Sequence, residues 1–126
     1  MDINDTQELE ALIVEDELDI CYLLRGILKK QHVVSECVTS LFDAQKALKN
    51  TLPDIIFIDN NLPDGYGVDF IPILKRDYPS TKIVVMTAQD TGADEDKALK
   101  LGADYFIGKP FTQDTIVNTL NNLIVN

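Results

Sequence analysis

The amino-acid sequence predicts a doubly wound α/β sandwich, in which helices cover both faces of a five-stranded parallel sheet. Short runs of β-branched or aromatic residues alternate along the chain with longer segments of helical period. Three of these runs are apolar without alternation, which is typical of strands buried on both faces of a parallel sheet. With 126 residues, of which 45% are hydrophobic, the chain has the length and apolar content of one domain. We therefore expect a single domain over residues 1–126, with a polar leader at about residues 1–9.

Five runs have the length and composition of β-strands. Most are bounded by Asp, Pro, Thr or Gly, which are common where strands end. The predicted strands are Leu12–Val14, Val33–Val38, Ile55–Ile58, Ile83–Met86 and Tyr105–Ile107.

The first two helices are predicted from an apolar stripe and from capping residues. Residues at three- and four-residue spacing form the stripe of the first helix: Leu18, Ile20, Leu23, Leu24, Ile27 and Leu28. The second helix is expected from Leu41 to Lys49. Thr39 or Ser40 would be its N-cap, and it should end before Pro53, which cannot continue a helix.

Three more helices complete the alternation. With Asp69 as its N-cap, the third would hold Pro72 in its first turn, where the missing N–H has no intrahelical partner to lose. The fourth should stop at Gly102. Its expected inner residues are Ala98, Leu99 and Leu101. The fifth should begin at Thr112 and bury Ile116, Val117, Leu120, Leu123 and Ile124.

Polar residues that could bind a ligand or take part in a reaction follow four of the predicted strands. Parallel crossovers are right-handed, so five β-α units predict a doubly wound sandwich, for which we expect the flavodoxin-like strand order 2-1-3-4-5. Ligands of such sheets bind at the carboxyl ends of the strands. The residues at those ends are Glu15, Asp16, Asp59, Thr87 and Lys109. If the first and third strands are neighbours, the three carboxylates converge on one small patch.

Converging carboxylates predict a divalent cation. At about 4 Å and an effective dielectric near 20, each pair of like charges costs on the order of 4 kcal/mol. A bound divalent cation attracts all three carboxylates and so turns the net repulsion into a net attraction. Oxygen-only ligands with room for water favour Mg2+, with Mn2+ as the alternative, over zinc.

Each of these residues also has an ordinary structural interpretation. Glu15 and Asp16 would suit an acidic helix start, and Asp59 would suit the turn formed by the Asn, Pro, Asp and Gly residues that follow it. Thr87 could simply end a strand, and Lys109 could extend along the rim. The coincidence of all of them at one end of four strands favours a functional site.

The chain resembles the receiver domain of two-component response regulators (the CheY-like superfamily) over almost its whole length. The motifs that carry the resemblance are Glu15-Asp16, the run from Ile55 to Asp59 with Leu62-Pro63 and Gly67 after it, Thr87-Ala88, and Gly102-Ala103-Asp104 leading to Lys109-Pro110-Phe111.

The resemblance implies a role for each site residue. Asp59 would be the phosphoacceptor, Glu15, Asp16 and Asp59 would bind Mg2+, and the carbonyl of Asn61 would complete the metal site. Thr87 and Lys109 would hold phosphoryl oxygens. Phe106 would be the aromatic residue that follows the movement of Thr87, although ordinary packing at the sheet edge explains it equally well.

A phosphorelay function follows from that resemblance. A sensor histidine kinase or a phosphotransfer protein would donate a phosphoryl group from phosphohistidine to Asp59, which would change the surface around the fourth helix, fifth strand and fifth helix for an unknown downstream effector. The domain would not be an enzyme, because it would catalyse only its own phosphorylation and dephosphorylation.

The sequence departs from the family pattern at three positions near the site. Asn60 stands where an aliphatic residue is usual, Leu62 stands where methionine is common, and Gly108 adds backbone freedom next to Lys109. None of these removes a predicted ligand.

Two rival functions stay open. One is a degenerate receiver that acts as a constitutive protein-binding module. The other is a phosphatase or phosphotransferase of the haloacid-dehalogenase type, which would want an acidic residue where Asn61 stands.

Charge and cysteine content narrow the setting. The net charge of −10 repels phosphate backbones and so argues against direct nucleic-acid binding. No apolar run is long enough for a membrane span, so we expect a cytoplasmic protein. Cys21 and Cys37 lack the close spacing of metal or redox motifs and are interpreted as small core residues.

The last helix has no charged residue after Asp114. Partial burial of this terminal helix would explain the pattern, and the alternative is a face that meets a partner or a second copy of the chain in a homodimer.

Overall fold

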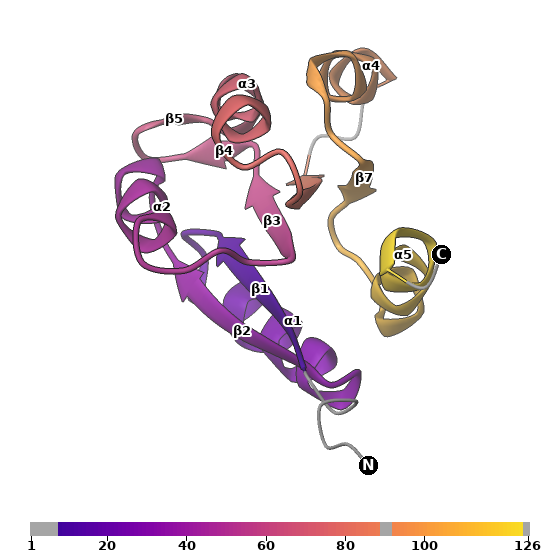
Figure 1. The fold of residues 1–126 in the computed structure, drawn as a ribbon. Helices are drawn as coiled ribbons and strands as arrows, with labels where there is room; N and C mark the ends of the chain where they lie inside the picture. The colour runs from indigo at the N-terminus through magenta and orange to yellow at the C-terminus, as the bar shows by residue number, and fades with distance from the viewer. Residues whose placement is uncertain (1–7, 89–91, 125–126) are drawn as a thin grey trace.

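The computed structural model describes residues 8–88 and 92–124. A parallel sheet with the order β2-β1-β3-β6-β7 forms the middle layer, which confirms the predicted order of the five main strands (Figure 1). These strands are β1 Leu9–Val14, β2 Val33–Val38, β3 Ile55–Asp59, β6 Lys82–Thr87 and β7 Tyr105–Gly108. The helices are α1 Leu18–Lys30, α2 Leu41–Leu48, α3 Gly67–Asp77, α4 Gly92–Leu101 and α5 Gln113–Ile124.

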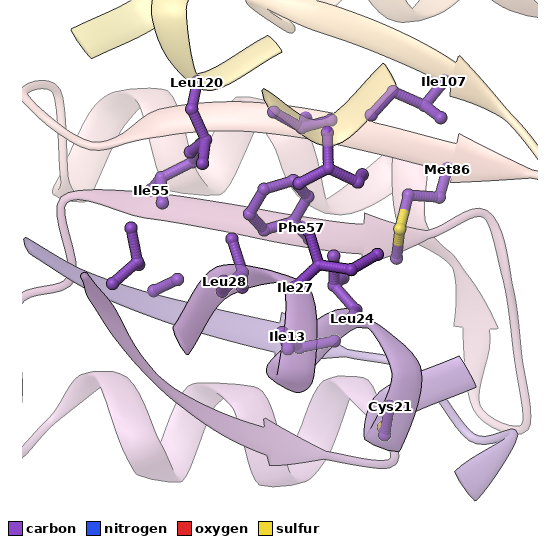
Figure 2. Packing of buried hydrophobic residues seen from close by; sticks show 14 residues of the cluster. Ile13, Cys21, Leu24, Ile27, Leu28, Ile55, Phe57, Met86, Ile107 and Leu120 are labelled. Carbon is purple, nitrogen blue, oxygen red and sulfur yellow. The ribbon is translucent and has the colours of Figure 1, made fainter. Parts of the chain in front are cut away.

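Two hydrophobic clusters hold the three layers together, one on each face of the sheet. On one face α1 and α5 pack against the strands, and Figure 2 shows Phe57 of β3 amid this cluster, with Leu24 of α1 and Leu120 of α5 also contributing. On the other face α2, α3 and α4 contribute Leu48, Ile71 and Ala98, among others. Every residue of β3 is buried, as predicted for a strand covered on both faces.

Strand β1 begins three residues earlier than predicted. Leu9 is its first residue, and the main-chain N–H of Glu10 donates a hydrogen bond to Asp54 Oδ2 at 2.8 Å. The predicted leader is therefore wrong for Leu9, and the rest of the leader apart from Glu8 lies outside the described residues.

The buried faces of α1 and α4 differ in detail from the predicted stripes. Leu18 and Leu23 of α1 are exposed, and Cys21 is buried instead. Leu23 follows Cys21 by two residues, which places it about 200° round the helix from the packed face. In α4 only Ala98 is buried, and its neighbour Leu99 is exposed. For α5, Ile116 and Leu120 are buried as predicted, whereas the side chain of Ile124 lies outside the described residues.

The start of α2 is held by two side chains. Ser40 Oγ accepts a hydrogen bond from Asp43 N–H, which confirms Ser40 as the N-cap. Asp64 lies 23 residues further along the chain than Leu41, and its carboxylate accepts hydrogen bonds from the N–H groups of Leu41 and Phe42, both at 2.9 Å. These main-chain hydrogen bonds lower the pKa of Asp64. The first-turn donors of α2 are therefore satisfied partly by a distant loop.

The N-cap of α3 was predicted three residues too late. The helix begins at Gly67, with Tyr66 rather than Asp69 at the N-cap, so Pro72 lies in the second turn. Its missing N–H leaves the carbonyl of Val68 without its usual helical donor.

A short antiparallel hairpin after β3 was not predicted. Its strands are β4, Asn61–Leu62, and β5, Gly65–Tyr66, joined through Pro63 and Asp64. A Pro-Asp-Gly turn is a recognisable signal for such a hairpin.

The two cysteines form a disulfide, which corrects their interpretation as separate core residues. Cys21 of α1 is buried, whereas Cys37 of β2 is only partly buried, and their Cα atoms are 6.2 Å apart. The two cysteines are 16 residues apart in sequence, and this spacing did not predict the disulfide. The pairing arises only because the folded chain packs α1 against β2.

Within the described ranges, none of the helices combines the length and the apolar character needed to cross a bilayer.

Candidate metal and phosphoacceptor site

The predicted site residues gather at the carboxyl edge of the sheet. Glu15 follows β1 directly, Asp59 ends β3, Thr87 ends β6 and Lys109 follows β7. Because the strands are parallel and these four are successive neighbours in the sheet, their last residues lie at the same edge.

Three carboxylates converge at this edge. One oxygen from each of Glu15, Asp16 and Asp59 lies within 4.8 Å of the other two. Glu15 is fully buried, Asp59 is 3% exposed and Asp16 is exposed, so the cluster opens to solvent on the side of Asp16. The predicted convergence is confirmed.

Lys109 lies between the buried carboxylates. Its Nζ is 2.8 Å from Glu15 Oε1 and 3.0 Å from Asp59 Oδ1, and the lysine side chain is only 7% exposed. It also lies 3.4 Å from Glu17 Oε1, a carboxylate that was not predicted to belong to the site. One cation thus offsets part of the repulsion within the acidic cluster.

Burial dominates the protonation behaviour of the two enclosed acids. Loss of water raises the pKa of Glu15 and that of Asp59, although hydrogen bonds and charge attraction from Lys109 act in the opposite direction. Burial acts to lower the pKa of Lys109, but its close ion pairs with the carboxylates of Glu15 and Asp59 raise that pKa overall. Lys109 therefore stays protonated beside two carboxyl groups whose charged forms are disfavoured by burial.

The loop after Asp59 is fixed by Asn60. The Asn60 N–H donates to the carbonyl of Met86 at 2.8 Å, and the Asn60 carbonyl accepts from Gly67 N–H at 2.9 Å. The side-chain Oδ1 of Asn60 accepts from Val68 N–H at 3.1 Å. The polar residue that departs from the family pattern thus satisfies donors in the first turn of α3, which explains why that helix begins at Gly67.

Asn61 is placed for a main-chain contribution. Its N–H donates to Asp59 Oδ2 at 3.3 Å, and its side chain is exposed. The residue is therefore adjacent to the carboxylate cluster, as predicted, while its role as a carbonyl ligand stays a prediction.

Gly67 allows the start of α3 to approach Asp59 closely. A Cβ atom at this position would lie well inside contact distance of the main-chain oxygen of Asp59 and would also touch Ile58. Only glycine permits this approach of the helix start to the end of β3.

Thr87 and Phe106 occupy neighbouring strands. Thr87 is 1% exposed, and its carbonyl accepts a hydrogen bond from Lys109 N–H at 2.8 Å. Gly108 pairs with Thr87 in the β6–β7 ladder, so the backbone before Lys109 is regular strand despite the glycine. Phe106 is partly buried against the cluster that contains Ala98 of α4, whereas Tyr105 packs on the opposite face.

The chemistry of the ligand set suits a hard divalent cation. The cluster offers carboxylate oxygens only, one of them solvent-facing, and the described part of the chain gives Asp59 Oδ1 no hydrogen bond of regular geometry. Because no well-directed donor from the described residues occupies Asp59 Oδ1, this oxygen is available as a metal ligand, although the Lys109 ammonium group lies near it.

Fold and site together define a doubly wound domain with an acidic site at the carboxyl edge of its parallel sheet. The family of the response regulator receiver domain matches residues 11–121. The chain therefore belongs to the response regulator receiver family, as a CheY-like domain of two-component signalling, and such a domain is not a conventional enzyme.

Individual relatives agree with this assignment. The chain is 33% identical over 114 residues to the chemotaxis protein CheY of Thermotoga maritima, covering 90% of this chain and 95% of that protein. It spans only a quarter of the length of other curated regulators with which it shares 31–32% identity over 112 residues.

Solved structures show the same fold. The beryllofluoride-activated NtrC4 receiver domain dimer matches with a TM-score of 0.87 and 30% identity, covering 92% of this chain and 96% of that chain. The receiver domain of sensor histidine kinase PA1611 from Pseudomonas aeruginosa PAO1 has a magnesium ion coordinated in its active-site cleft. It matches with a TM-score of 0.84 and 20% identity, covering 95% of this chain and all of that chain.

Proposed function

We propose that this receiver domain accepts a phosphoryl group on Asp59 from the phosphohistidine of a sensor histidine kinase or a phosphotransfer protein, in a reaction that requires Mg2+. The observation that carries the proposal is the carboxylate cluster of Glu15, Asp16 and Asp59 with Lys109 bridging its two buried members. Receiver domains pair with histidine kinases, and the magnesium ion of the PA1611 receiver supports the choice of metal.

The carboxylates of Glu15, Asp16 and Asp59 and the carbonyl of Asn61 would hold Mg2+, which neutralises charge on the phosphoryl oxygens. Mn2+ would substitute because it prefers the same oxygen ligands.

Asp59 acts as the nucleophile. A carboxylate oxygen attacks phosphorus, the bond between phosphorus and the donor imidazole breaks, and its electron pair returns to the imidazole nitrogen. The product is an acyl phosphate on Asp59. Lys109, already 3.0 Å from Asp59 Oδ1, stays beside the carboxylate and pairs with a phosphoryl oxygen.

The neighbouring strands β6 and β7 then respond to the phosphoryl group on Asp59. It adds about 1.5 to 2 negative charges and strong acceptor oxygens, to which the Thr87 hydroxyl turns as a donor. Since Thr87 and Gly108 are paired and Phe106 packs near α4, this movement changes the surface formed by α4, β7 and α5. That surface is the one we assign to the downstream effector or to a second copy of the domain. The beryllofluoride-activated NtrC4 receiver domain is itself a dimer, which supports the second of these partners.

Phosphorylation by a small donor tests the proposal. The chain is incubated with acetyl phosphate and Mg2+, and intact mass spectrometry should detect one added phosphoryl group. Asp59→Asn should prevent the addition. Asp77→Asn is the matched control, because Asp77 is an exposed carboxylate at the last residue of α3, and it should be modified like the wild type.

An unmodified wild type, or equal modification of Asp59→Asn, would overturn the assignment. Binding of Mg2+ without any phosphoryl addition would instead support a constitutive binding module.

A further inference from the structure

The disulfide joins two elements that flank the proposed metal site. Cys21 lies in the first half of α1 and is 4% exposed, and Cys37 lies near the end of the edge strand β2. The separation of 6.2 Å between their Cα atoms lies within the range that a disulfide bridges without backbone movement.

The sulfur atoms lie against the loop that carries two of the acidic ligands. Cys21 Sγ is 3.3 Å and Cys37 Sγ 3.7 Å from the main-chain oxygen of Glu15. In addition, Glu15 N–H donates to the carbonyl of Val38, the residue after Cys37, at 2.9 Å. Both cysteines thus contact the main chain of Glu15, whose carboxylate belongs to the cluster with Asp16 and Asp59.

We infer that Cys21 and Cys37 form a reversible thiol–disulfide pair whose state sets the Mg2+ affinity of the neighbouring site, with the disulfide form binding the metal more tightly. The inference rests on the proposed function for the identity of the metal, but the exchange chemistry and its readout are separate.

The cross-link forms by exchange with a small-molecule disulfide. The Cys37 thiolate, the more exposed of the two, attacks one sulfur of that disulfide and releases one small thiol. The Cys21 thiolate then attacks Cys37 Sγ and releases the second small thiol. The two cysteine thiols are oxidised, the small disulfide is reduced to two thiols, and a dithiol reductant reverses the reaction.

Close packing beneath Glu15 gives the direction of the effect. Bonded sulfur atoms lie about 2 Å apart, whereas non-bonded heavy atoms need roughly 3.5–4 Å. Reduction therefore demands extra space between α1 and β2, directly under the Glu15 carbonyl. A close-packed interior passes that demand to the loop of Glu15 and Asp16. The disulfide form keeps the carboxylates in the converged arrangement described above.

The test compares Mg2+ binding by the two redox states of the full chain. One sample is oxidised with glutathione disulfide and the other reduced with dithiothreitol, and alkylation followed by mass spectrometry counts the free thiols in each. Calorimetric titration with Mg2+ should give a Kd about fivefold lower for the disulfide form, which lies at the low end of usual coupling between sites.

The double variant Cys21→Ala/Cys37→Ala is the control. It should bind Mg2+ with the same affinity in both buffers, because it has no thiols to exchange. If the double variant does not fold, Cys37→Ser alone serves, because it also prevents the cross-link.

Four results would overturn the inference. They are equal Kd values for the two wild-type forms, tighter binding by the reduced form, two free thiols after treatment with glutathione disulfide, and a redox difference that persists in the control. Mg2+ uptake by neither form would instead count against the proposed metal site itself, and the coupling would fall with it.

Discussion

Lys109 Nζ lies 2.8 Å from Glu15 Oε1, and the two side chains, 94 residues apart in sequence, are 7% and 0% exposed. The same ammonium group is 3.0 Å from Asp59 Oδ1. A single lysine therefore forms ion pairs with two buried carboxylates, so its removal should affect both the stability of the domain and its phosphorylation.

Lys109→Met should destabilise the Mg2+-free domain. Breaking a buried ion pair by removing one partner costs about 3–5 kcal/mol, because the remaining charges are left uncompensated. Urea unfolding without Mg2+ measures the loss, and added Mg2+ should recover part of it.

Lys97→Met is the matched control for that change. Its ammonium lies 3.9 Å from Asp69 Oδ1 on the exposed surface, where such pairs contribute about 0–1 kcal/mol. A loss at Lys109 no larger than that at Lys97 would contradict the importance of the buried pair.

Asp59→Asn should stabilise the Mg2+-free domain at about pH 7. Burial raises the pKa of Asp59, so the folded state favours the protonated acid more than the unfolded state does. This contribution to the free energy of unfolding is complete below the ordinary value of 3.8 and is lost as the pH rises through the raised pKa.

The difference in stability between Asp59→Asn and the wild type should therefore grow as the pH rises from 3.8 toward neutrality. Urea unfolding over this range without Mg2+ measures it, and saturating Mg2+ should shrink the difference at neutral pH. A gain that did not vary with pH would show that the ionisation of Asp59 is not its cause.

Gly67→Ala and Gly26→Ala should have opposite effects. The added methyl group at Gly67 meets the main-chain oxygen of Asp59, which cannot move without displacing the end of β3, so a loss of about 1–3 kcal/mol is expected. At Gly26, within α1, the methyl group meets nothing within 4 Å, so a gain of about 0.5–1 kcal/mol is expected from helix propensity.

Thermal or urea unfolding of both glycine variants checks this pair. Equal effects at the two positions would mean that the close approach of α3 to Asp59 does not constrain the fold.

Asn60→Leu should cost about 1 kcal/mol, the usual loss when a helix start loses a side-chain acceptor. The variant removes the Oδ1 atom that accepts from Val68 N–H. Asn60→Asp keeps an acceptor in a position where a negative charge suits the N-terminus of α3, so it should retain most of the stability. Chemical denaturation of both variants without Mg2+ measures this, and equal losses would count against the hydrogen bond.

Local patterns sufficed to predict the layers of this domain. The apolar runs that became β1, β2, β3, β6 and β7 are buried on both faces or lie at the sheet edges, and periodicity carries that information directly. The convergence of Glu15, Asp16 and Asp59 followed from strand order, because parallel strands share one carboxyl edge.

Features that depend on contacts between distant segments were missed or misplaced. The start of α3 is fixed by Asn60, which lies before it in another segment, and the bridge between Cys21 and Cys37 depends on how α1 packs against β2. Glu17 contacts Lys109 from the other end of the chain. Neither spacing nor composition encodes such pairings, since they arise only once the tertiary fold exists.

The hydrogen bonds from Leu41 and Phe42 to Asp64 also bear on the order in which the domain folds during synthesis. The chain leaves the ribosome from its N-terminus, so α2 is made before the residue that holds its first two N–H groups. That helix acquires its complete start only after β3 and the following turn have emerged. The first three strands and α2 should therefore consolidate as one cooperative unit rather than element by element.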